Sequence, residues 1–324
     1  MKIFVTGGTG FIGSHLIDHF LDYKDAEIYA LVRDLNNVKW LTGLNIIFLK
    51  GDLLHIPALP PDIDYVFHIA GSIKASKMAD YYTVNLQGTA SVFQSLLSQG
   101  ISPKKAVYLS SLAASGPSQD GHPVREEDEP CPVSPYGKSK LDGEIEALKF
   151  KSKLPLVIAR VGAVYGPRDR SFLPYFKTIK RGILPSVGSA SQLVSLIYIK
   201  DLVHALNLCA QKDTESGAIF HIADPQIYSI DEMGLIAAKV MDVKLKKVKF
   251  PIPLAYTAAV ISECIGKIRK NPGVFNRQRF QELKQDTWVA DSTKAKEVLS
   301  FSPCVTLQKG VEETIHWYLQ HEWL

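Results

Sequence analysis

Short apolar runs recur along the first half of the chain, and most of them are separated by longer segments with helical periodicity. Each run is nearly continuous and has no hairpin dipeptide beside it, a pattern typical of strands that are buried on both faces of a parallel sheet. Six such runs lie at 2–5, 28–32, 46–49, 65–70, 106–110 and 156–159. The intervening segments at 11–21, 80–97 and 134–149 are long enough for crossover helices. This alternation predicts an α/β fold with a doubly wound parallel sheet.

The alternation loosens after Tyr165, where helical stretches are mixed with two further strand-like runs. These runs lie at 193–199 and 218–223, and we expect both to return to the first sheet or to its edge. Residues 1–165 are therefore predicted to form a sheet domain. Residues 166–324 are predicted to form mainly a smaller lobe that is discontinuous in sequence.

The composition places the chain among ordinary globular proteins and excludes some classes of partner. Apolar residues make up 46% and charged residues 22%, which excludes a disordered or fibrous chain. The 37 basic and 33 acidic residues are spread along the sequence, so we expect no nucleic-acid partner. None of the four cysteines has CxxC spacing, and the pair His15 and His19 has no evident third ligand, so we predict no metal site. Glycines interrupt the first residues before a signal-peptide core can form, and we expect a cytoplasmic protein with reduced thiols.

A glycine-rich turn, Thr6-Gly7-Gly8-Thr9-Gly10-Phe11-Ile12-Gly13, joins the first predicted strand to the first predicted helix. Gly7 permits the tight turn, Gly10 lets the backbone approach a pyrophosphate, and Gly13 lets the helix pack closely on the sheet. The start of the helix, at Phe11 and Ile12, offers N–H groups and a partial positive charge. At this place in the fold, the motif predicts a Rossmann-type site for a dinucleotide.

The end of the second predicted strand bears on which nicotinamide cofactor is bound. NAD enzymes usually place an acidic residue there for the ribose 2′-hydroxyl, whereas this chain has Val32 at the strand tip and Arg33 after it. An arginine suits a 2′-phosphate, so NADP(H) is favoured, although the neighbouring Asp34 leaves NAD(H) open. At the end of the third strand, Asp52 is expected near the adenine, with Leu53 beside it.

A further helix is predicted to begin at Ser134-Pro135, because serine suits the N-cap and proline the first helical position. Tyr136 and Lys140 are four residues apart in this helix, so both side chains emerge on one face. A lysine ammonium beside a phenol lowers the pKa of the tyrosine, which can then act as a general acid or base on a carbonyl or hydroxyl. The pair Ser110-Ser111 ends the fifth strand, where a serine hydroxyl could orient the reacting oxygen.

Together these motifs resemble those of the extended short-chain dehydrogenases/reductases, the NAD(P)-dependent epimerase/dehydratase family. The similarity is greatest to its 3β-hydroxysteroid dehydrogenase and dihydroflavonol reductase members. The matching motifs occur in the family's order across nearly the whole chain: TGGTGFIG at 6–13, Gly51-Asp52, His68-Ile69-Ala70-Gly71, Asn85-Leu86-Gln87-Gly88-Thr89, Ser110-Ser111, Tyr136 with Lys140, Arg160 with Tyr165-Gly166-Pro167, Tyr198-Ile199-Lys200-Asp201, and Trp288 with Asp291-Ser292-Thr293-Lys294-Ala295. The resemblance implies a Rossmann domain at 1–165 that binds NADP(H), and a lobe at 166–324 that binds mainly the substrate.

The resemblance also implies a catalytic triad. Ser111, Tyr136 and Lys140 would form it, with Lys140 also holding the nicotinamide ribose. Ser111 is preferred to Ser110 because the family's catalytic serine or threonine lies five residues before the next glycine, here Gly116. Hydride would pass between the nicotinamide and a substrate carbon while Tyr136 moves the proton.

Other site residues follow from the same resemblance. Asn85 would shape the catalytic site from its helix. Further cofactor contacts are expected at Ala70, Gly71, Val161 and Gly162. Substrate contacts are expected at Ser72, Lys74, Ser111 and Ala113. Members of the family commonly form homodimers through the helices that carry Asn85 and Tyr136, and we expect a homodimer here.

Two departures from the family's nucleotide-sugar members bear on the substrate. Those members usually carry an arginine for the diphosphate at the position of Val194, and a tyrosine at the position of Ser115. Lys200, Arg168 or Arg170 could take the place of that arginine. Both departures resemble the members that act on ketones and alcohols.

We therefore predict an NAD(P)-dependent oxidoreductase that transfers hydride between the cofactor and a ketone or secondary alcohol. The small-molecule substrate is expected to be apolar or lipid-like. A nucleotide-sugar 4-epimerase or dehydratase with tightly bound NAD is the alternative. A sensor that binds NADP(H) without turnover is the third hypothesis.

The segment 250–268 is largely apolar, but it is short for a membrane span and contains Glu263 and Lys267. We therefore expect no transmembrane segment. One interpretation is an amphipathic helix that covers the substrate lobe. The other is that the segment lines an apolar pocket or rests on a membrane surface, which would fit a lipid-like substrate.

Overall fold

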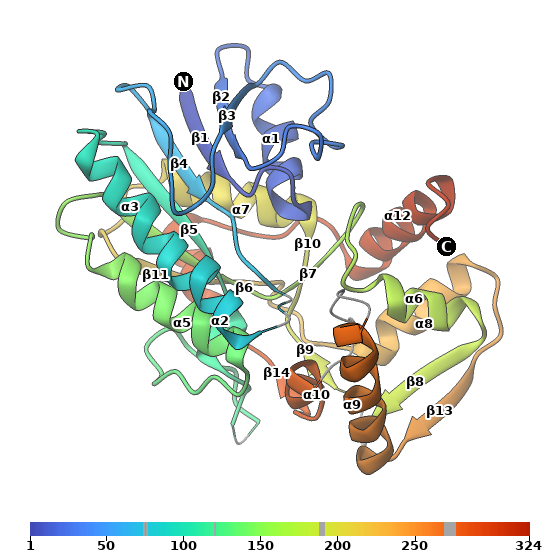
Figure 1. Ribbon diagram of the computed structural model, residues 1–324. Coiled ribbons are helices and arrows are strands. Elements are labelled where there is room, and N and C mark those ends of the chain that lie inside the picture. Colours follow the sequence, from blue (N-terminus) through green and yellow to red (C-terminus); the bar gives the residue numbers. More distant parts are fainter. Residues whose placement is uncertain (74, 76, 120, 188–191, 269–276) are drawn as a thin grey trace.

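The computed structural model describes residues 1–324 except 74, 76, 120, 188–191 and 269–276. A seven-stranded parallel sheet forms its centre, with the strand order β11-β6-β5-β4-β1-β2-β3 (Figure 1). These strands are β1 (Lys2–Thr6), β2 (Glu27–Val32), β3 (Ile47–Lys50), β4 (Tyr65–His68), β5 (Lys105–Ser111), β6 (Leu156–Val161) and β11 (Ala218–Ile222). The chain starts in the middle of the sheet and winds outward in both directions, which confirms the predicted doubly wound α/β fold.

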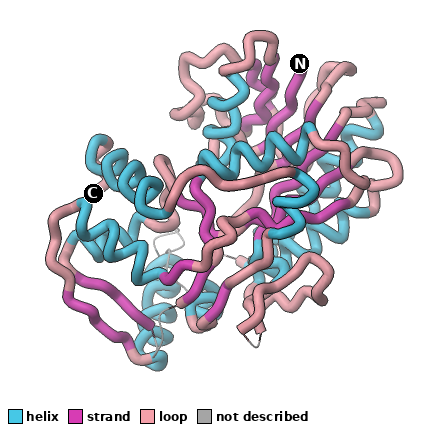
Figure 2. The backbone as a smooth tube through the Cα atoms, turned by 180° about the vertical axis from the view of Figure 1, so that it is seen from behind, coloured by secondary structure: helices cyan, strands magenta, loops and turns pink. Residues whose placement is uncertain are grey.

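Residues of the central strands alternate between two buried apolar layers, one on each face of the sheet. On β1, Val5 belongs to one layer and its neighbour Phe4 to the other. Helices cover both faces (Figures 1 and 2). The first face is covered by α1 (Phe11–Leu21) and α7 (Ile199–Gln211), with α11 (Thr293–Leu299) packed on β11, and the second by α3 (Gly88–Ser98) and α5 (Pro135–Leu148). Because both faces are covered, the strands can be the nearly continuous apolar runs seen in the sequence.

After β6 the chain leaves the central sheet and builds a second lobe from small sheets and helices (Figure 1). The short strands are β7 (Ala163–Tyr165), β8 (Ile183–Val187), β9 (Leu193–Val194), β10 (Leu196–Tyr198), β12 (Tyr228–Ser229), β13 (Lys246–Phe250) and β14 (Thr287–Trp288). The helices of this lobe are α6 (Leu173–Lys180), α8 (Ile230–Val240), α9 (Ile252–Ile268), α10 (Arg277–Leu283) and α12 (Leu307–Gln320). Strand β10 pairs with β7, β9 with β12 and β14, and β13 with β8.

Of the two strand-like runs expected at the central sheet, the structure places one there. The run at 218–223 supplies β11, which pairs with β6 at the edge of the sheet. The run at 193–199 forms β9 and β10, which belong to small sheets of the second lobe, and this corrects the expectation. The reason is that β5 and β11 occupy both sides of β6, so β10 pairs with β7, the short strand that follows β6.

Aromatic side chains connect the C-terminal helix to the first domain. The ring centroids of Trp317 and Trp323 lie 5.7 and 6.4 Å from that of Trp40, which lies in the loop after β2. The guanidinium of Arg168 lies 5.0 Å from the Trp40 ring and adds a cation–π contact. These contacts hold α12 against the sheet domain.

The apolar segment at 250–268 forms the end of β13 and helix α9, and the side chains described up to residue 263 are only partly covered. Ala255 and Ala259 are buried, whereas Leu254 and Ile261 are exposed. Within the part of the chain that the structure describes, we find no helix with both the length and the apolar character needed to span a membrane.

Candidate active site

A cleft of about 990 Å³ lies at the carboxyl ends of the central strands, the edge at which doubly wound folds bind ligands. The residues expected to contact the cofactor all line it: Gly7, Gly10, Phe11, Ile12, Gly13, Arg33, Asp52, Leu53, Ala70, Gly71, Tyr136, Lys140, Val161 and Gly162. Ser72 and Ser111 line the cleft as well. Ala113 and Asn85 are not in its lining, and Lys74 lies outside the described residues.

The glycine-rich turn is folded so tightly that two of its glycines have no room for a side chain. Gly7 has a φ of +74°, and a Cβ there would lie 2.6 Å from the amide nitrogen of Ala70. A Cβ on Gly13 would overlap the carbonyl oxygen of Gly7. Gly10 is the N-cap of α1 and supplies no side-chain cap, so the first N–H groups of this helix border the cleft. This backbone surface fits the pyrophosphate of a dinucleotide.

The tip of β2 places a positive charge beside the cleft. The exposed Arg33 lines it, whereas Asp34 does not. The Asp34 carboxylate instead accepts a hydrogen bond from the Asn36 amide at 2.9 Å. Asp52 also lines the cleft, and its carboxylate accepts hydrogen bonds from amides of its own turn. At the β2 tip, the arginine is thus better placed than Asp34 to contact a cofactor.

Tyr136 lines the cleft one helical turn before Lys140, near the start of α5. The helix begins as predicted, because the Ser134 hydroxyl accepts a hydrogen bond from an amide of the first turn at 3.0 Å. Tyr136 is half-buried, and its ring centroid lies 6.2 Å from that of Tyr81 on α2 (Met78–Tyr82). A phenol and an ammonium on one helix therefore border one cavity, an arrangement that suits proton transfer to or from a substrate oxygen.

Lys140 is nearly buried at the edge of this cleft, and strand β5 fixes its ammonium group. Its Nζ donates to the Leu109 carbonyl at 2.7 Å and to the Tyr108 hydroxyl at 3.0 Å. Burial lowers the pKa of Lys140 to about 7, against the opposing effect of the Glu144 carboxylate. The lysine is therefore held in one position and can lose its charge near neutral pH.

The two serines at the end of β5 have different partners. Ser111 caps the short helix α4 (Leu112–Ser115), and its Oγ accepts a hydrogen bond from the Ala113 amide at 3.2 Å. The hydroxyl proton of Ser111 therefore remains available for donation. The Ser110 hydroxyl instead donates to Glu144. Of the two, Ser111 is better placed to bind a substrate oxygen.

Asn85 is fully buried behind the cleft wall, in a short π-helical turn, η1 (Thr83–Gln87). Its Oδ1 accepts a hydrogen bond from the Ser72 amide at 2.7 Å. Its Nδ2 donates to the Ser72 carbonyl at 3.1 Å and to the Ser139 hydroxyl at 2.9 Å. Asn85 thus joins the loop after β4 to α5 and positions the wall at Ser72.

Residues of β5 and α5 meet in pairs beside the cleft. Tyr108 bonds Lys140, and Ser110, two residues further along the strand, bonds Glu144, one turn further along the helix. Sequence reasoning missed Tyr108 and Glu144, because one resembles a core aromatic and the other a solvated helix residue. The spacing of two on the strand and four on the helix was the available signal, since each spacing places its two residues on one face.

Glu144 forms a buried ion pair with Arg160 on β6, and a polar chain continues beyond it. Arg160 Nη1 donates to the Ser115 hydroxyl at 3.1 Å, and Ser115 Oγ lies 3.2 Å from Nε2 of His221. Burial and the charge of Arg160 lower the pKa of His221 to about 4. This series of polar contacts thus links the end of β5 to β11. Within it, Ser115 is the hydrogen-bond partner of the buried Arg160.

His68, at the end of β4, is buried and neutral, because burial, with a contribution from the Lys140 charge, lowers its pKa to about 3. The Thr89 hydroxyl donates to the Asn85 carbonyl at 2.8 Å, so it accepts a hydrogen bond from His68 Nε2 at 3.0 Å. His68 Nδ1 then accepts a hydrogen bond from the Thr6 hydroxyl at 2.7 Å. The hydrogen bonds from Thr6 through His68 to Thr89 thus connect the start of the glycine-rich turn to α3.

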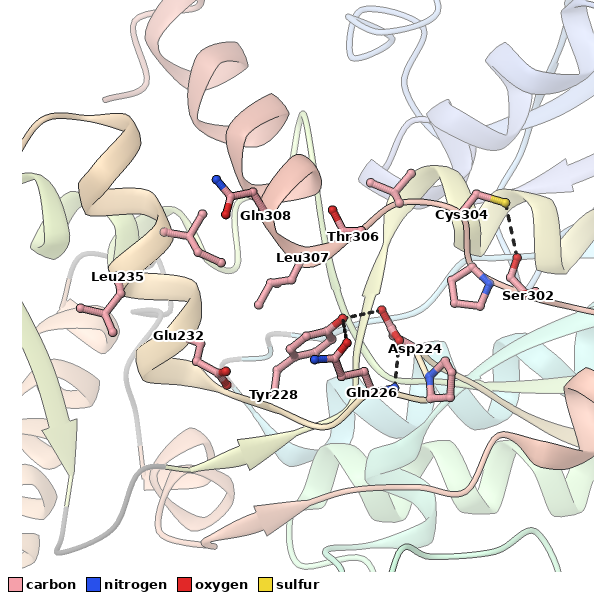
Figure 3. Close-up of a pocket in the computed structure, with 14 residues that line it drawn as sticks. Asp224, Gln226, Tyr228, Glu232, Leu235, Ser302, Cys304, Thr306, Leu307 and Gln308 are labelled. Atoms are coloured by element: carbon pink, nitrogen blue, oxygen red, sulfur yellow. Dashed lines mark hydrogen bonds between the residues drawn. The ribbon is translucent and has the colours of Figure 1, made fainter.

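A second hollow of about 590 Å³ lies between α8 and the start of α12 (Figure 3). Asp224 accepts hydrogen bonds there from the Tyr228 hydroxyl at 2.8 Å and the Gln226 amide at 2.9 Å. The residues predicted for the cofactor, the substrate and the reaction do not line it. No group of three or more His, Cys, Asp or Glu residues in the described ranges is arranged to hold a metal ion.

Comparisons with known proteins add to this geometry. A sequence model of the NAD dependent epimerase/dehydratase family matches residues 3–223, which include the central sheet and most of the cleft lining. The chain is similar to a decarboxylating sterol-4-alpha-carboxylate 3-dehydrogenase of Schizosaccharomyces pombe, with 29% identity over 96% of this chain and 95% of that protein. It is also similar to the ceramide reductase of Caulobacter vibrioides, with 26% identity over 99% of this chain and 95% of that protein.

A solved structure shows a similar fold across both lobes. It is a UDP-glucuronic acid 4-epimerase from Bacillus cereus, in complex with UDP-glucuronic acid and NAD. The TM-score is 0.78 at 25% identity, and the match covers 99% of this chain and 100% of that chain. The proteins similar to this chain thus include a dehydrogenase, a reductase and an epimerase.

Proposed function

The chain belongs to the NAD dependent epimerase/dehydratase family, and within it we propose an oxidoreductase that transfers hydride between NADP(H) and a ketone or secondary alcohol. The observation that carries this proposal is a shared cavity. Tyr136, Lys140 and Ser111 border the same cleft as the glycine-rich turn between β1 and α1. A nicotinamide and a reacting carbon–oxygen bond could therefore lie side by side in it.

Each residue of the proposed site has its own task. When bound, the nicotinamide supplies or accepts the hydride. Ser111 donates a hydrogen bond to the substrate oxygen, and Tyr136 gives a proton to that oxygen or removes one, according to the direction. Lys140, fixed by Tyr108 and the Leu109 carbonyl, would hold the nicotinamide ribose. In its protonated form it also places positive charge on the side of the cleft where Tyr136 lies, which favours the phenolate.

The preference for NADP(H) rests on the β2 tip. The Arg33 side chain is exposed and lines the cleft, where a guanidinium could form charge-assisted hydrogen bonds with a 2′-phosphate. Asp34, which would favour a free 2′-hydroxyl, accepts a hydrogen bond from its own turn and is absent from the lining. A guanidinium without a competing carboxylate supports NADP(H) over NAD(H).

The charges of the cleft support a substrate without a diphosphate. Among its described lining residues, the basic ones are Arg33 and Lys140, and both belong to the sheet domain. The lining from the second lobe includes the acidic residues Asp169 and Glu282 and the apolar Phe172. Such a wall repels a pyrophosphate and suits an apolar molecule. The sterol dehydrogenase and ceramide reductase among the relatives, by their names, act on substrates of this kind.

The basic residues that could replace the missing arginine are engaged elsewhere. Lys200 forms an ion pair with Glu313 at 2.9 Å, and Arg168 forms one with Asp18 at 2.8 Å. The Arg170 guanidinium lies 5.0 Å from a tryptophan ring centroid of the C-terminal segment. These three residues are not in the described lining of the cleft, which supports the same substrate class.

A screen of the purified protein tests the proposal against its alternatives. Ketones, secondary alcohols, sterol and ceramide derivatives, and UDP- and dTDP-sugars are supplied with NADPH, NADP, NADH or NAD. We expect turnover of an apolar ketone or alcohol with added NADP(H). Tyr136→Phe should lower kcat at least about a hundredfold and leave cofactor affinity nearly unchanged, whereas the control Tyr81→Phe should retain most activity.

Other outcomes of this screen would contradict the proposal. Conversion of a nucleotide sugar without added cofactor, with stoichiometric NAD(H) that survives dialysis, would identify a 4-epimerase or dehydratase. The similarity to the Bacillus cereus epimerase favours this alternative. Tight NADPH binding without turnover of any compound would indicate a sensor instead.

A further inference from the structure

One end of the second lobe concentrates positive charge. Residues 243–262 contain four lysines and no acidic residue, so their formal charge equals the +4 of the whole chain. These exposed lysines lie on β13 and just before it: Lys244, Lys246, Lys247 and Lys249. Lys247 forms an ion pair with Asp231 of α8. Arg181, just before β8, is also exposed. The next residue, Gly182, accepts a hydrogen bond from the Lys246 amide at 2.8 Å, so Arg181 and Lys246 lie at the same end of the β8–β13 ribbon.

Exposed apolar side chains follow these lysines directly. Phe250 ends β13 and Ile252 begins α9, and both are exposed. On α9, Leu254, Ala258 and Ile261 have the spacing i, i+4, i+7 and form an exposed apolar stripe, in which Leu254 is 57% and Ile261 59% exposed. Figures 1 and 2 both show α9 beside the β8–β13 ribbon, at the end of the lobe away from the central sheet.

The other side of α9 packs toward the cleft. Ala255 and Ala259 contact Phe280 on α10, and together they form a small buried cluster. Two residues further along α10, Glu282 lines the cleft. The exposed stripe thus lies on the outer side of a helix whose inner side supports the wall of the cleft.

We propose that a basic apolar patch docks the protein on the surface of a membrane that contains anionic lipids. The patch consists of exposed residues at the end of β13 and on α9: Lys246, Lys249, Phe250, Ile252, Leu254 and Ile261. Lys246 and Phe250 lie on one face of β13 and Lys249 on the other, so the two lysines flank the strand. Apolar side chains at the acyl boundary, flanked by lysines at the level of the lipid phosphates, are typical of segments that lie in a membrane interface. A second copy of the chain fits this surface less well, because a symmetric contact would bring the lysines of both copies together.

Docking in this way would place α9 between the lipid and α10, the helix that carries the cleft-lining Glu282. The use of this position for an apolar substrate rests on the proposed function. The docking itself rests on the charge and exposure of the patch alone. A binding measurement without substrate therefore tests it independently of the enzyme activity.

The test is co-sedimentation of the full chain with vesicles of phosphatidylcholine alone, or with added phosphatidylglycerol. At low salt we expect at least about tenfold stronger binding to the anionic vesicles, and weaker binding as salt is added. The double variants Lys246→Gln/Lys249→Gln and Leu254→Gln/Ile261→Gln should each reduce binding at least about fivefold. The matched control Lys296→Gln/Val298→Gln, which changes an exposed lysine and an exposed apolar residue on α11, should bind like the parent.

The melting temperature and NADPH affinity of each variant establish that it is folded. No binding to anionic vesicles at low salt would overturn the proposal, and so would equal binding to neutral vesicles or equal losses in the control. If the patch variants instead change the oligomeric state measured by light scattering, the patch is an interface between copies and the membrane assignment is wrong.

Discussion

The Glu144 carboxylate and the Arg160 guanidinium form an ion pair sealed from water beside the cleft, with Nη2 2.8 Å from Oε2 and side chains 2% and 3% exposed. Each partner has a further bond, because Ser110 donates to Glu144 and Arg160 donates to Ser115. Such a pair contributes little net stability when intact, since desolvation offsets the attraction. Removal of one partner, however, leaves a buried charge without compensation.

We predict that Glu144→Gln lowers the free energy of unfolding by about 3 kcal/mol, because it leaves the Arg160 charge buried. Arg160→Met should cost a similar amount, and the double variant should cost clearly less than the sum of the two. Urea unfolding of the three variants measures this coupling. The control Glu127→Gln removes an exposed ion pair with Lys294 and should cost less than about 1 kcal/mol. Strictly additive losses would show that the pair is not coupled.

A second prediction concerns the hydrogen bond that fixes Lys140. Tyr108→Phe removes the hydroxyl that accepts from Nζ and leaves the aromatic ring in the core. We expect kcat on a confirmed substrate to fall about tenfold, since a hydrogen bond of this kind contributes roughly 1 to 1.5 kcal/mol. Tyr29→Phe is the control, because it removes a hydroxyl that bonds Glu27 on β2, away from the proposed catalytic residues. Unchanged kcat in Tyr108→Phe would exclude a positioning role for this tyrosine.

The parts of the fold and site that the sequence predicts are those set by local rules. A nearly continuous apolar run predicts a buried strand, and glycine spacing predicts the turn at 6–13. The spacing of four residues places Tyr136 and Lys140 on one helix face. These rules need no knowledge of which elements become neighbours, and they bring the predicted cofactor residues to one cleft.

What the sequence does not predict depends on contacts between elements. Tyr108 and Glu144 acquire partners only because β5 and α5 pack face to face, and neither residue shows this in its own segment. The run at 193–199 looks like any strand of the central sheet. It is divided instead between two small sheets of the second lobe. Its second part, β10, pairs with β7 because β5 and β11 occupy both sides of β6, and this depends on the topology of the whole sheet.

A third prediction follows from two buried histidines. The pKa values of His68 and His221 in the folded protein are lowered to about 3 and about 4, mainly by burial, whereas the unfolded chain has the ordinary value near 6.5. Their contribution to stability is therefore complete above about pH 6.5 and is lost as the pH falls toward the folded-state values. Between pH 7 and 5, each histidine should lower the free energy of unfolding by about 2 kcal/mol.

Urea unfolding at pH 7, 6 and 5 measures this loss. His221→Gln should remove about 2 kcal/mol of this loss, because the variant lacks the proton that His221 takes up on unfolding. The rest of the loss comes from His68 and from His15 and His19, whose pKa values are also lowered by burial. The control His122→Gln changes an exposed histidine and should leave the slope as it is. A free energy of unfolding that is constant from pH 7 to 5 would show that neither histidine is held neutral by the fold.

The last prediction concerns the choice between the two nicotinamide cofactors. Arg33→Ala removes the guanidinium at the β2 tip, so we expect the Kd for NADPH to rise about tenfold or more and that for NADH to change little. The effect on NADPH should shrink at high salt, because Arg33 is exposed and its attraction to a phosphate is screened. Fluorescence titration with both cofactors measures the two affinities, with Arg125→Ala as a control for the loss of an exposed arginine. Equal losses for NADPH and NADH would mean that Arg33 contacts a part common to both cofactors, and unchanged affinities would place it outside the binding site.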